Sequence, residues 1–262
     1  MPHPALRELA HRPWPMPAGR WVMQQRWEEL LFAHWPVEAD ALRALLPPGL
    51  ELDTFEGQAW LGVVPFMMRG VRARWAPPLP TTHSFAELNV RIYVRHGDRP
   101  GVWFLSLDAA SALAVAGARL LYHLPYFRAS MRSTRRDQEI EYVSTRTHRG
   151  AARAELRASY APCGPASPAE EHSLEHFLCE RYCLYAADAK GALWRGEIQH
   201  APWPLQPAEA EFEHNTMAAA HGLELPDAEP HLLYADTLPV VVWPLERVDT
   251  YARGADVRAQ GA

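Results

Sequence analysis

The sequence feature that most constrains the fold is a strict two-residue alternation over residues 85–95. One set of alternate positions is aliphatic, whereas the other carries Glu87, Asn89, Arg91 and Tyr93. Successive side chains of a β-strand point to opposite faces, so this period predicts a strand with its aliphatic face buried. The polar face is open to two interpretations. It is either a solvated outer surface, or the wall of an enclosed polar cavity in which Glu87 and Arg91 pair away from water.

Strand patterns recur along the rest of the chain, and the helical patterns are short. We expect strands over residues 21–34, 50–54, 58–66, 102–107, 128–133, 139–147, 152–160, 182–187 and 193–200, and two short strands within 231–248. We expect helices over residues 37–46, 109–122, 168–181 and 207–220, the third of which starts at a capping box of Ser167 and Glu170. The prediction is a strand-dominated α+β fold with about four helices, in which many antiparallel strands favour a barrel or a two-layer sandwich.

The chain has neither an internal repeat nor a linker that would divide it, so its 262 residues predict one domain. Its 24 prolines disfavour long helices and favour strands that are joined by rigid turns. We expect a loosely ordered proline-rich arm over residues 1–19, a single domain over residues 20–248, and a disordered tail over residues 249–262.

Composition narrows the classes of partner and location. The formal net charge is -5, which gives no basic surface to attract nucleic acid. No apolar run approaches the ~18 residues that span a bilayer, and the N-terminal segment lacks the apolar core of a signal peptide. Three cysteines, an odd number, argue against a disulfide scaffold. We therefore expect a cytoplasmic protein that binds neither nucleic acid nor membrane.

Motifs for nucleotide binding and for serine hydrolases are absent, since the chain has no G-x-G-x-x-G, G-x-x-x-x-G-K-[ST] or G-x-S-x-G. We therefore expect no cofactor. The sequence contains a single lysine, Lys190, which falls in the turn of a predicted hairpin. A lysine in such a turn is normally solvated, so covalent chemistry by an amine has one poorly placed candidate.

One metal-binding motif matches: residues 172–176 (HSLEH) have the H-x-x-E-H pattern on a predicted helix. Two histidines four residues apart on a helix share a face and could hold zinc, with Glu175 as a general base. Roughly 0.05 such matches are expected by chance from this composition, and no third ligand stands out. We therefore expect a polar helix surface with Cys179 packed inward, and a zinc-dependent hydrolase is the less favoured alternative.

Several segments together resemble the bacterial YqjF-like family, whose function is unknown. They are residues 27–35 (WEELLFAHW), 45–53 (LLPPGLELD), 59–66 (AWLGVVPF), 87–94 (ELNVRIYV), 101–109 (GVWFLSLDA), 124–129 (LPYFRA), 181–185 (RYCLY) and 200–205 (HAPWPL). The resemblance covers about residues 14–248, and it is specific because so many motifs occur in the same order.

This family is in turn similar to acetoacetate decarboxylase, which implies a cone-shaped antiparallel β-barrel that encloses a pocket. Glu87 stands where the decarboxylase has a glutamate that supports catalysis, and Arg119 matches one of its arginines. The two lysines of the decarboxylase are replaced by Tyr126 and Phe127. Because the first lysine forms its Schiff base, the resemblance implies the fold but not the reaction. It also leaves homo-oligomerisation open, since the decarboxylase assembles into large rings.

The hypothesis that follows is a decarboxylase-like barrel that binds a small carboxylate or carbonyl compound in its lumen, without Schiff-base catalysis. Arg91 or Arg119 would hold an anionic group through paired guanidinium donors, and Asn89 and Tyr93 would line the same wall.

Glu87 and Tyr126 are the candidate catalytic residues. Glu87 would act as a general base or hold Arg91 in place, and Tyr126 would donate a hydrogen bond or act as a general acid. The rival hypothesis is a non-catalytic barrel for ligand sensing or for an interaction, in which the side chains of Tyr126 and Phe127 fill the pocket.

Overall fold

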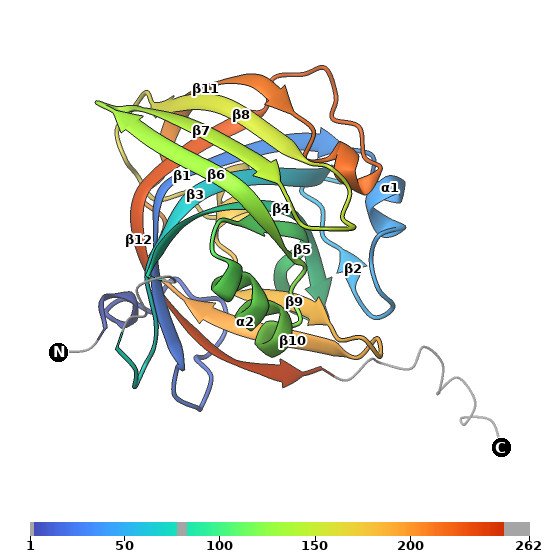
Figure 1. Cartoon of the computed structure of the whole chain (residues 1–262). Coiled ribbons are helices and arrows are strands. Elements are labelled where there is room, and N and C mark those ends of the chain that lie inside the picture. Colours follow the sequence, from blue (N-terminus) through green and yellow to red (C-terminus); the bar gives the residue numbers. More distant parts are fainter. Residues whose placement is uncertain (1–2, 78–82, 249–262) are drawn as a thin grey trace.

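The computed structural model describes residues 3–77 and 83–248. Strands dominate the described chain (Figure 1). They are β1 (Met23–Val37), β2 (Glu51–Leu52), β3 (Ala59–Ala73), β4 (Ser84–His96), β5 (Arg99–Ala109), β6 (Tyr126–Arg136), β7 (Glu139–Arg146), β8 (Glu155–Pro162), β9 (Cys183–Ala187), β10 (Leu193–Gln199), β11 (Gln206–Asn215) and β12 (His231–Arg247). The α-helices are α1 (Ala39–Arg43), α2 (Ala112–Tyr122) and α3 (Leu174–Cys179), and two 3-10 turns cover Pro4–Leu6 and Ala219–His221. The expected strand-dominated α+β class is confirmed.

The sheet divides at two strands, β5 and β12. One edge of β5 pairs along its length with β4, while its other edge pairs with β9 at one end and with β6 at the other. In the same way, β12 pairs with β1 on one edge and with both β10 and β11 on the other. The strands β12-β1-β3-β4-β5 therefore belong to two closed circuits. The smaller ring is completed by β9 and β10, and the larger ring by β6, β7, β8 and β11 (Figure 1). Closed circuits are compatible with the expected barrel.

The strand predicted over residues 85–95 is β4, and it is buried on both faces. Leu88 and Val90 point into the larger ring with no exposed surface, and their aliphatic neighbours share this core. Glu87 and Asn89 point the other way, into the smaller ring, and are only 2% and 7% exposed. The solvated-surface interpretation is therefore wrong, because this strand lies within both rings.

Helix α2 lies beside the smaller ring, between β5 and β6 in the chain (Figure 1). The Ser111 hydroxyl caps it by accepting a hydrogen bond from the Ala114 amide at 3.2 Å. His123 ends it in the left-handed conformation, and the chain then enters β6 through Leu124 and Pro125. This turn brings Tyr126 back beside Leu107 of β5 in a parallel register.

The helix predicted over residues 207–220 is wrong, because most of this segment is strand β11. Its alanines and glutamates favour a helix by propensity. They also alternate, however, so that Ala208, Ala210 and Phe212 pack against the core while the intervening glutamates are exposed. Pairing with β8 decides the outcome, since tertiary contacts override propensity. In the same region, the two short strands expected within 231–248 form the single strand β12.

The helix expected over residues 168–181 is shorter than predicted and starts later. Ser167 does not cap it but forms an isolated bridge with Leu205, and the N-cap of α3 is Ser173. His172 therefore precedes the helix, with a positive φ of 67°, and does not share a helical face with His176. The geometric premise of the zinc motif fails. Cys179 is buried, as expected.

The N-terminal segment is not the loosely ordered arm that its composition suggested. Arg12 is buried, donates to the Ile198 carbonyl at 2.6 Å, and pairs with the Glu197 carboxylate of β10. Trp14 donates to the same carboxylate at 2.8 Å. Aperiodic segments give no signal of such polar anchors, so the error came from reading the absence of periodicity as the absence of order. The tail predicted over residues 249–262 lies outside the described residues.

Among the described helices, none combines the length and the apolar character that crossing a membrane requires.

Candidate functional site

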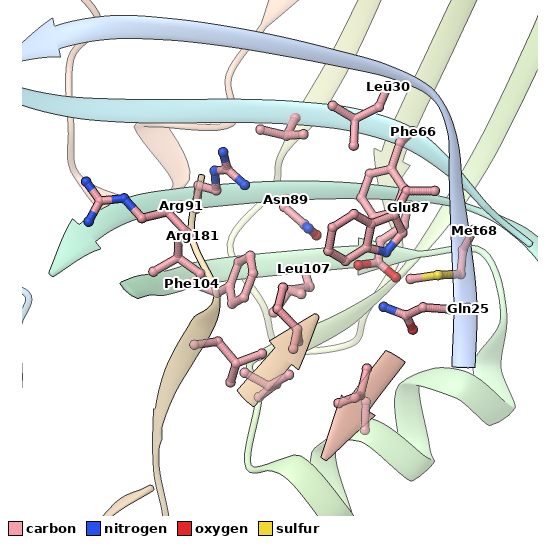
Figure 2. A pocket seen from close by; sticks show the side chains of 18 of the residues that line it. Gln25, Leu30, Phe66, Met68, Glu87, Asn89, Arg91, Phe104, Leu107 and Arg181 are labelled. Carbon is pink, nitrogen blue, oxygen red and sulfur yellow. The ribbon is translucent and has the colours of Figure 1, made fainter. Parts of the chain in front are cut away.

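The smaller ring encloses a cavity of about 120 Å³ (Figure 2). Side chains from β1, β3, β4, β5, β9, β10 and β12 line it, together with residues of α2 and the start of β6. A cavity of about 150 Å³ accommodates a benzene molecule, so this space suits a ligand of a few heavy atoms. Most of the lining is apolar. Its charged groups are Glu87 and Arg91 of β4 and Arg181 after α3, and further polar side chains come from other elements.

Glu87 and Tyr126 form the central polar pair of the cavity. The Tyr126 hydroxyl donates to the Glu87 carboxylate, with distances of 3.0 and 3.1 Å to the two oxygens. Burial raises the pKa of Glu87 to about 8, although the hydrogen bonds from Tyr126 and Asn89 act against this rise. Burial also holds the pKa of Tyr126 well above its usual range, so the phenol stays protonated. The pair can therefore exchange a proton through the carboxyl group close to neutral pH.

The local sequence explains how this pair arises. Glu87 lies opposite Phe66 of β3 and Ala109 of β5, so it is held in the middle of the shared strands. Tyr126 reaches it because Pro125 ends the turn after α2 and starts β6 beside β5. Arg119 steadies this turn by donating to the Tyr126 carbonyl at 2.7 Å.

Two arginines mark the other end of the polar wall. Arg91 donates to the Leu178 carbonyl at 2.9 Å and lies 5.0 Å above the Phe32 ring. Arg181 is 5% exposed and donates to the Asp53 carboxylate at 2.6 Å through Nη1. Its Nη2 is buried without a hydrogen-bond partner among the described residues. A guanidinium keeps its charge in such surroundings, so this end of the cavity suits an anionic group.

The structure places four of the predicted site residues in the cavity lining, one behind it and one outside it. Glu87, Asn89, Arg91 and Tyr126 line the cavity. Tyr93 lies behind this wall, where its hydroxyl is 2.6 Å from Nε2 of the buried His34 and 3.3 Å from Nε of Arg91.

Arg119 does not fit its expected role as a ligand-binding residue. Its side chain is exposed, and it is absent from the cavity lining. The expected Glu87–Arg91 pair is also absent, since no ion pair joins these two residues in the described part of the chain. The Arg91 guanidinium is instead turned toward the Leu178 carbonyl and the Phe32 ring.

Comparison with known proteins gives a family with no stated function. A profile described as an uncharacterized conserved protein family, DUF2071, matches residues 24–239. A relative named "Uncharacterized protein YqjF", from Bacillus subtilis (strain 168), is 47% identical over 232 residues, which cover 88% of this chain and 95% of the relative. The chain belongs to the DUF2071 family. The expected YqjF-like relationship is thus confirmed.

Solved structures share the fold of this DUF2071 protein at low sequence identity. The enduracididine biosynthesis enzyme MppR, complexed with pyruvate, has a TM-score of 0.63 and 14% identity, with 92% of this chain and 95% of that chain covered. An acetoacetate decarboxylase from Legionella pneumophila has a TM-score of 0.61 and 14% identity, with 96% and 99% covered. At such identity the likeness shows the fold alone, and it confirms the expected acetoacetate decarboxylase-like architecture.

The single lysine of this DUF2071 protein lies outside the cavity lining, so it is not placed to form a Schiff base with a ligand there. Lys190 is exposed in the turn between β9 and β10 and does not line the cavity. Because the sequence holds no other lysine, the cavity has no lysine amine to form a Schiff base.

Sequence reasoning missed Arg181 and two tryptophans, Trp27 and Trp203. The indole rings stack with centroids 5.6 Å apart, line the cavity, and have buried Nε1 atoms without a partner among the described residues. The only available signal was that all three residues fall in segments shared with the family. Aperiodic positions outside strands and helices carry no burial pattern, so nothing else pointed to Arg181.

Proposed function

We propose that the cavity binds a small oxo acid and that Glu87, assisted by Tyr126, exchanges a proton with it. The observation that carries this proposal is the pairing of a fully enclosed carboxyl group with a tyrosine donor, in a cavity with arginines at its other end. A carboxyl group that is isolated from cations and solvent is costly as a structural element, and such groups gather at functional sites.

The anionic end of the ligand would lie toward the arginines. Arg181 offers a buried donor that no described group satisfies, and Arg91 lies on the same wall as Glu87. Guanidinium groups bind carboxylates through paired donors and remain charged when buried. Asn89 lies between the arginines and Glu87, and its buried Oδ1 also lacks a partner among the described residues. The unsatisfied groups of the wall would thus complement a carboxylate and a hydroxyl or enol.

The reactive end of the ligand would lie against Glu87. In its ionised form, the carboxylate takes a proton from the carbon next to the ligand's carbonyl group, so that a C–H bond breaks, an O–H bond forms, and an enolate results. Return of the proton to the same or another atom completes an exchange or an isomerisation. A carboxyl group with a pKa of about 8 suits both directions near neutral pH. The Tyr126 hydroxyl stabilises the ionised carboxylate through its hydrogen bond.

Two further observations support an open, reactive cavity over the non-catalytic alternative. The alternative expects Tyr126 and Phe127 to fill the lumen, yet Phe127 packs outside it, with its ring 4.3 Å from the Arg146 guanidinium carbon. In addition, MppR, which shares this fold, has been solved in complex with pyruvate and with the condensation product of pyruvate and imidazole 4-carboxaldehyde. Those complexes belong to another protein, but they are consistent with an oxo acid as a ligand of this fold.

The test is proton exchange in heavy water, followed by NMR. We expect the wild-type protein to accelerate deuterium incorporation next to the carbonyl group of pyruvate or acetoacetate. Glu87→Gln keeps the shape and the hydrogen-bonding capacity of the side chain, and it should lower the exchange rate by at least about 100-fold, the usual contribution of a general base. Binding, measured by calorimetry, should persist in this variant.

The anion end has its own matched pair of variants. Arg91→Gln should weaken oxo-acid binding about 10- to 100-fold, the range expected for loss of a charge-assisted hydrogen bond. Arg95→Gln, at the exposed end of the same strand and outside the cavity lining, should leave binding unchanged. Equal losses in both variants, or exchange that survives in Glu87→Gln, would contradict the proposed site.

A further inference from the structure

A second hollow adjoins the cavity, between α2 and the strands β1 and β3. It is an open groove of about 370 Å³. Six residues line both the groove and the cavity: Met23, Gln25, Met68, Ala118, Tyr122 and Tyr126. Because these side chains belong to both walls, the two spaces are neighbours and these side chains form the boundary between them. The remaining groove wall is apolar apart from the charged Arg72, in contrast to the polar wall of the cavity.

Strand β4 sets the order of the two spaces. Phe85, Glu87, Asn89 and Arg91 succeed one another on one face of this strand, at intervals of two residues. Phe85 lines the groove, while the other three line the cavity. Figure 2 shows the same order, with Glu87 near Met68 and Gln25 and with Arg91 at the far end. The site therefore runs from an anion-binding end, through the Glu87–Tyr126 pair, to an apolar end.

On the α2 side of the groove, large apolar side chains are exposed to solvent. Leu113 and Leu121 of α2 line it, and they are 54% and 68% exposed. Between them, Gly117 leaves open space, since a Cβ atom at this position would meet no atom within 4 Å. Apolar surface that is left open beside a cavity is typical of a ligand-binding groove.

We propose that the groove holds the apolar tail of the same ligand, so that the substrate class is an oxo acid with an alkyl or aryl extension. This inference rests on the proposed function of the cavity. The carboxylate lies toward Arg91 and Arg181, the carbonyl lies beside Glu87 and Tyr126, and the tail leaves past Tyr122 into the groove. The shared boundary selects this occupant, because a ligand whose head group lies beside Glu87 and Tyr126 and whose tail passes Tyr122 would enter the groove.

The test compares a ligand series in two matched variants of α2. The series runs from pyruvate through 2-oxobutanoate and 2-oxohexanoate to 4-phenyl-2-oxobutanoate, with dissociation constants measured by calorimetry. In the wild-type protein we expect the affinity to rise with tail length, by up to roughly fourfold for each buried methylene group. Gly117→Leu fills the open space of the groove, so it should remove this rise and lower the affinity for the longest ligand at least tenfold, while pyruvate binds as before. Ala116→Leu places the same side chain at an exposed position that does not line the groove, and it should keep the rise.

The outcomes separate this inference from the proposed function. Pyruvate binding with no dependence on tail length, or an unchanged series in Gly117→Leu, overturns the tail groove and leaves the cavity site intact. A matched series of methyl ketones tests the tail alone. If long ketones bind in a Gly117-dependent way but no oxo acid binds better than its ketone, the groove stands and the anionic head group fails. Light scattering covers the remaining occupant: a dimer that Gly117→Leu dissociates, without any change in ligand affinity, assigns the groove to a second copy of the chain.

Discussion

Strands β4 and β5 are buried on both faces, yet the two faces differ in whether a buried acidic side chain has a cationic partner. In the larger ring, the buried Asp108 faces Arg146, whose Nε donates to its carboxylate at 2.9 and 3.1 Å. In the smaller ring, the buried Glu87 has a tyrosine and an asparagine as partners, and no described residue forms an ion pair with it. Asp108 and Glu87 lie on neighbouring strands, β5 and β4, and point in opposite directions. Burial alone therefore does not distinguish the two faces, whereas a buried acid without an ion-pair partner among the described residues does.

The largest expected effect comes from breaking the paired side. Asp108→Asn leaves the buried Arg146 guanidinium without a counter-ion, so the free energy of unfolding should fall by about 3 kcal/mol or more. Urea denaturation measures this change. Arg153→Ala, which breaks an exposed pair with Glu155, should have little effect. A loss as small as that of the control would mean that Asp108 and Glu87 are not different in kind.

In the smaller ring, a smaller effect is expected: the stability of the protein should depend on pH through Glu87. Because the pKa of Glu87 is raised to about 8 in the folded protein, the folded state retains a proton that the unfolded state has lost above about pH 4.5. The free energy of unfolding should therefore fall as the pH rises through this window, by at most about 1.4 kcal/mol per pH unit. Glu87→Gln removes this dependence.

The comparison of the wild-type protein with Glu87→Gln over pH 6.5 to 8 isolates the contribution of Glu87. Burial raises the pKa of Asp108 only to about 6, and it lowers the pKa of His34, His200 and His231 below their usual value of 6.5. In the folded protein these groups thus titrate below the chosen range. In the unfolded chain the histidines titrate at about 6.5, but they contribute equally to both proteins. Chemical denaturation at several pH values should therefore show a more negative slope of the free energy of unfolding against pH in the wild-type protein than in Glu87→Gln. Identical slopes would place Glu87 in its ionised form throughout, against the proposed acid–base role.

The sequence contained the alternation of β4 but could not show what each face meets. Leu88 and Glu87 are both buried because one edge of β5 pairs with β9 at one end and with β6 at the other, which creates two rings. These pairings depend on contacts between segments that lie far apart in the chain. A period of two identifies a strand and its two faces, yet it does not distinguish solvent from a second interior. The sequence alone therefore leaves open whether the polar face of β4 meets solvent or an enclosed cavity.

Local sequence rules predict helix α2, but they do not predict strand β11 or the inward-facing Arg181. Helix α2 was predictable because its Ala/Leu-rich run is bounded by Ser111 and by Pro125. Strand β11 escaped because alanine and glutamate favour helices in isolation, and only its pairing with β8 overrides them. Arg181 escaped for a different reason: it lies in the short connection after α3, where neither periodicity nor a motif identifies a side chain that turns inward. Of the candidate site, the positions on regular strands could be predicted, and those on connections could not.

The smallest expected effect compares one defect in both interiors. Asn89 in the smaller ring and Ser144 in the larger ring each have a buried side-chain oxygen without a partner among the described residues. A buried polar group without a partner is costly, so Ser144→Ala should stabilise the protein by about 1 kcal/mol, seen as a rise in Tm. Asn89→Leu removes a similar oxygen but also the hydrogen bond from Asn89 to Glu87, so the two changes should offset each other and leave Tm nearly unchanged. Only Asn89→Leu should also weaken oxo-acid binding, because its oxygen faces the ligand cavity. If Ser144→Ala weakens binding equally, the two interiors are coupled. If Asn89→Leu strongly destabilises the protein and leaves oxo-acid binding unchanged, the Asn89 side chain serves the fold, which contradicts its proposed role in ligand binding.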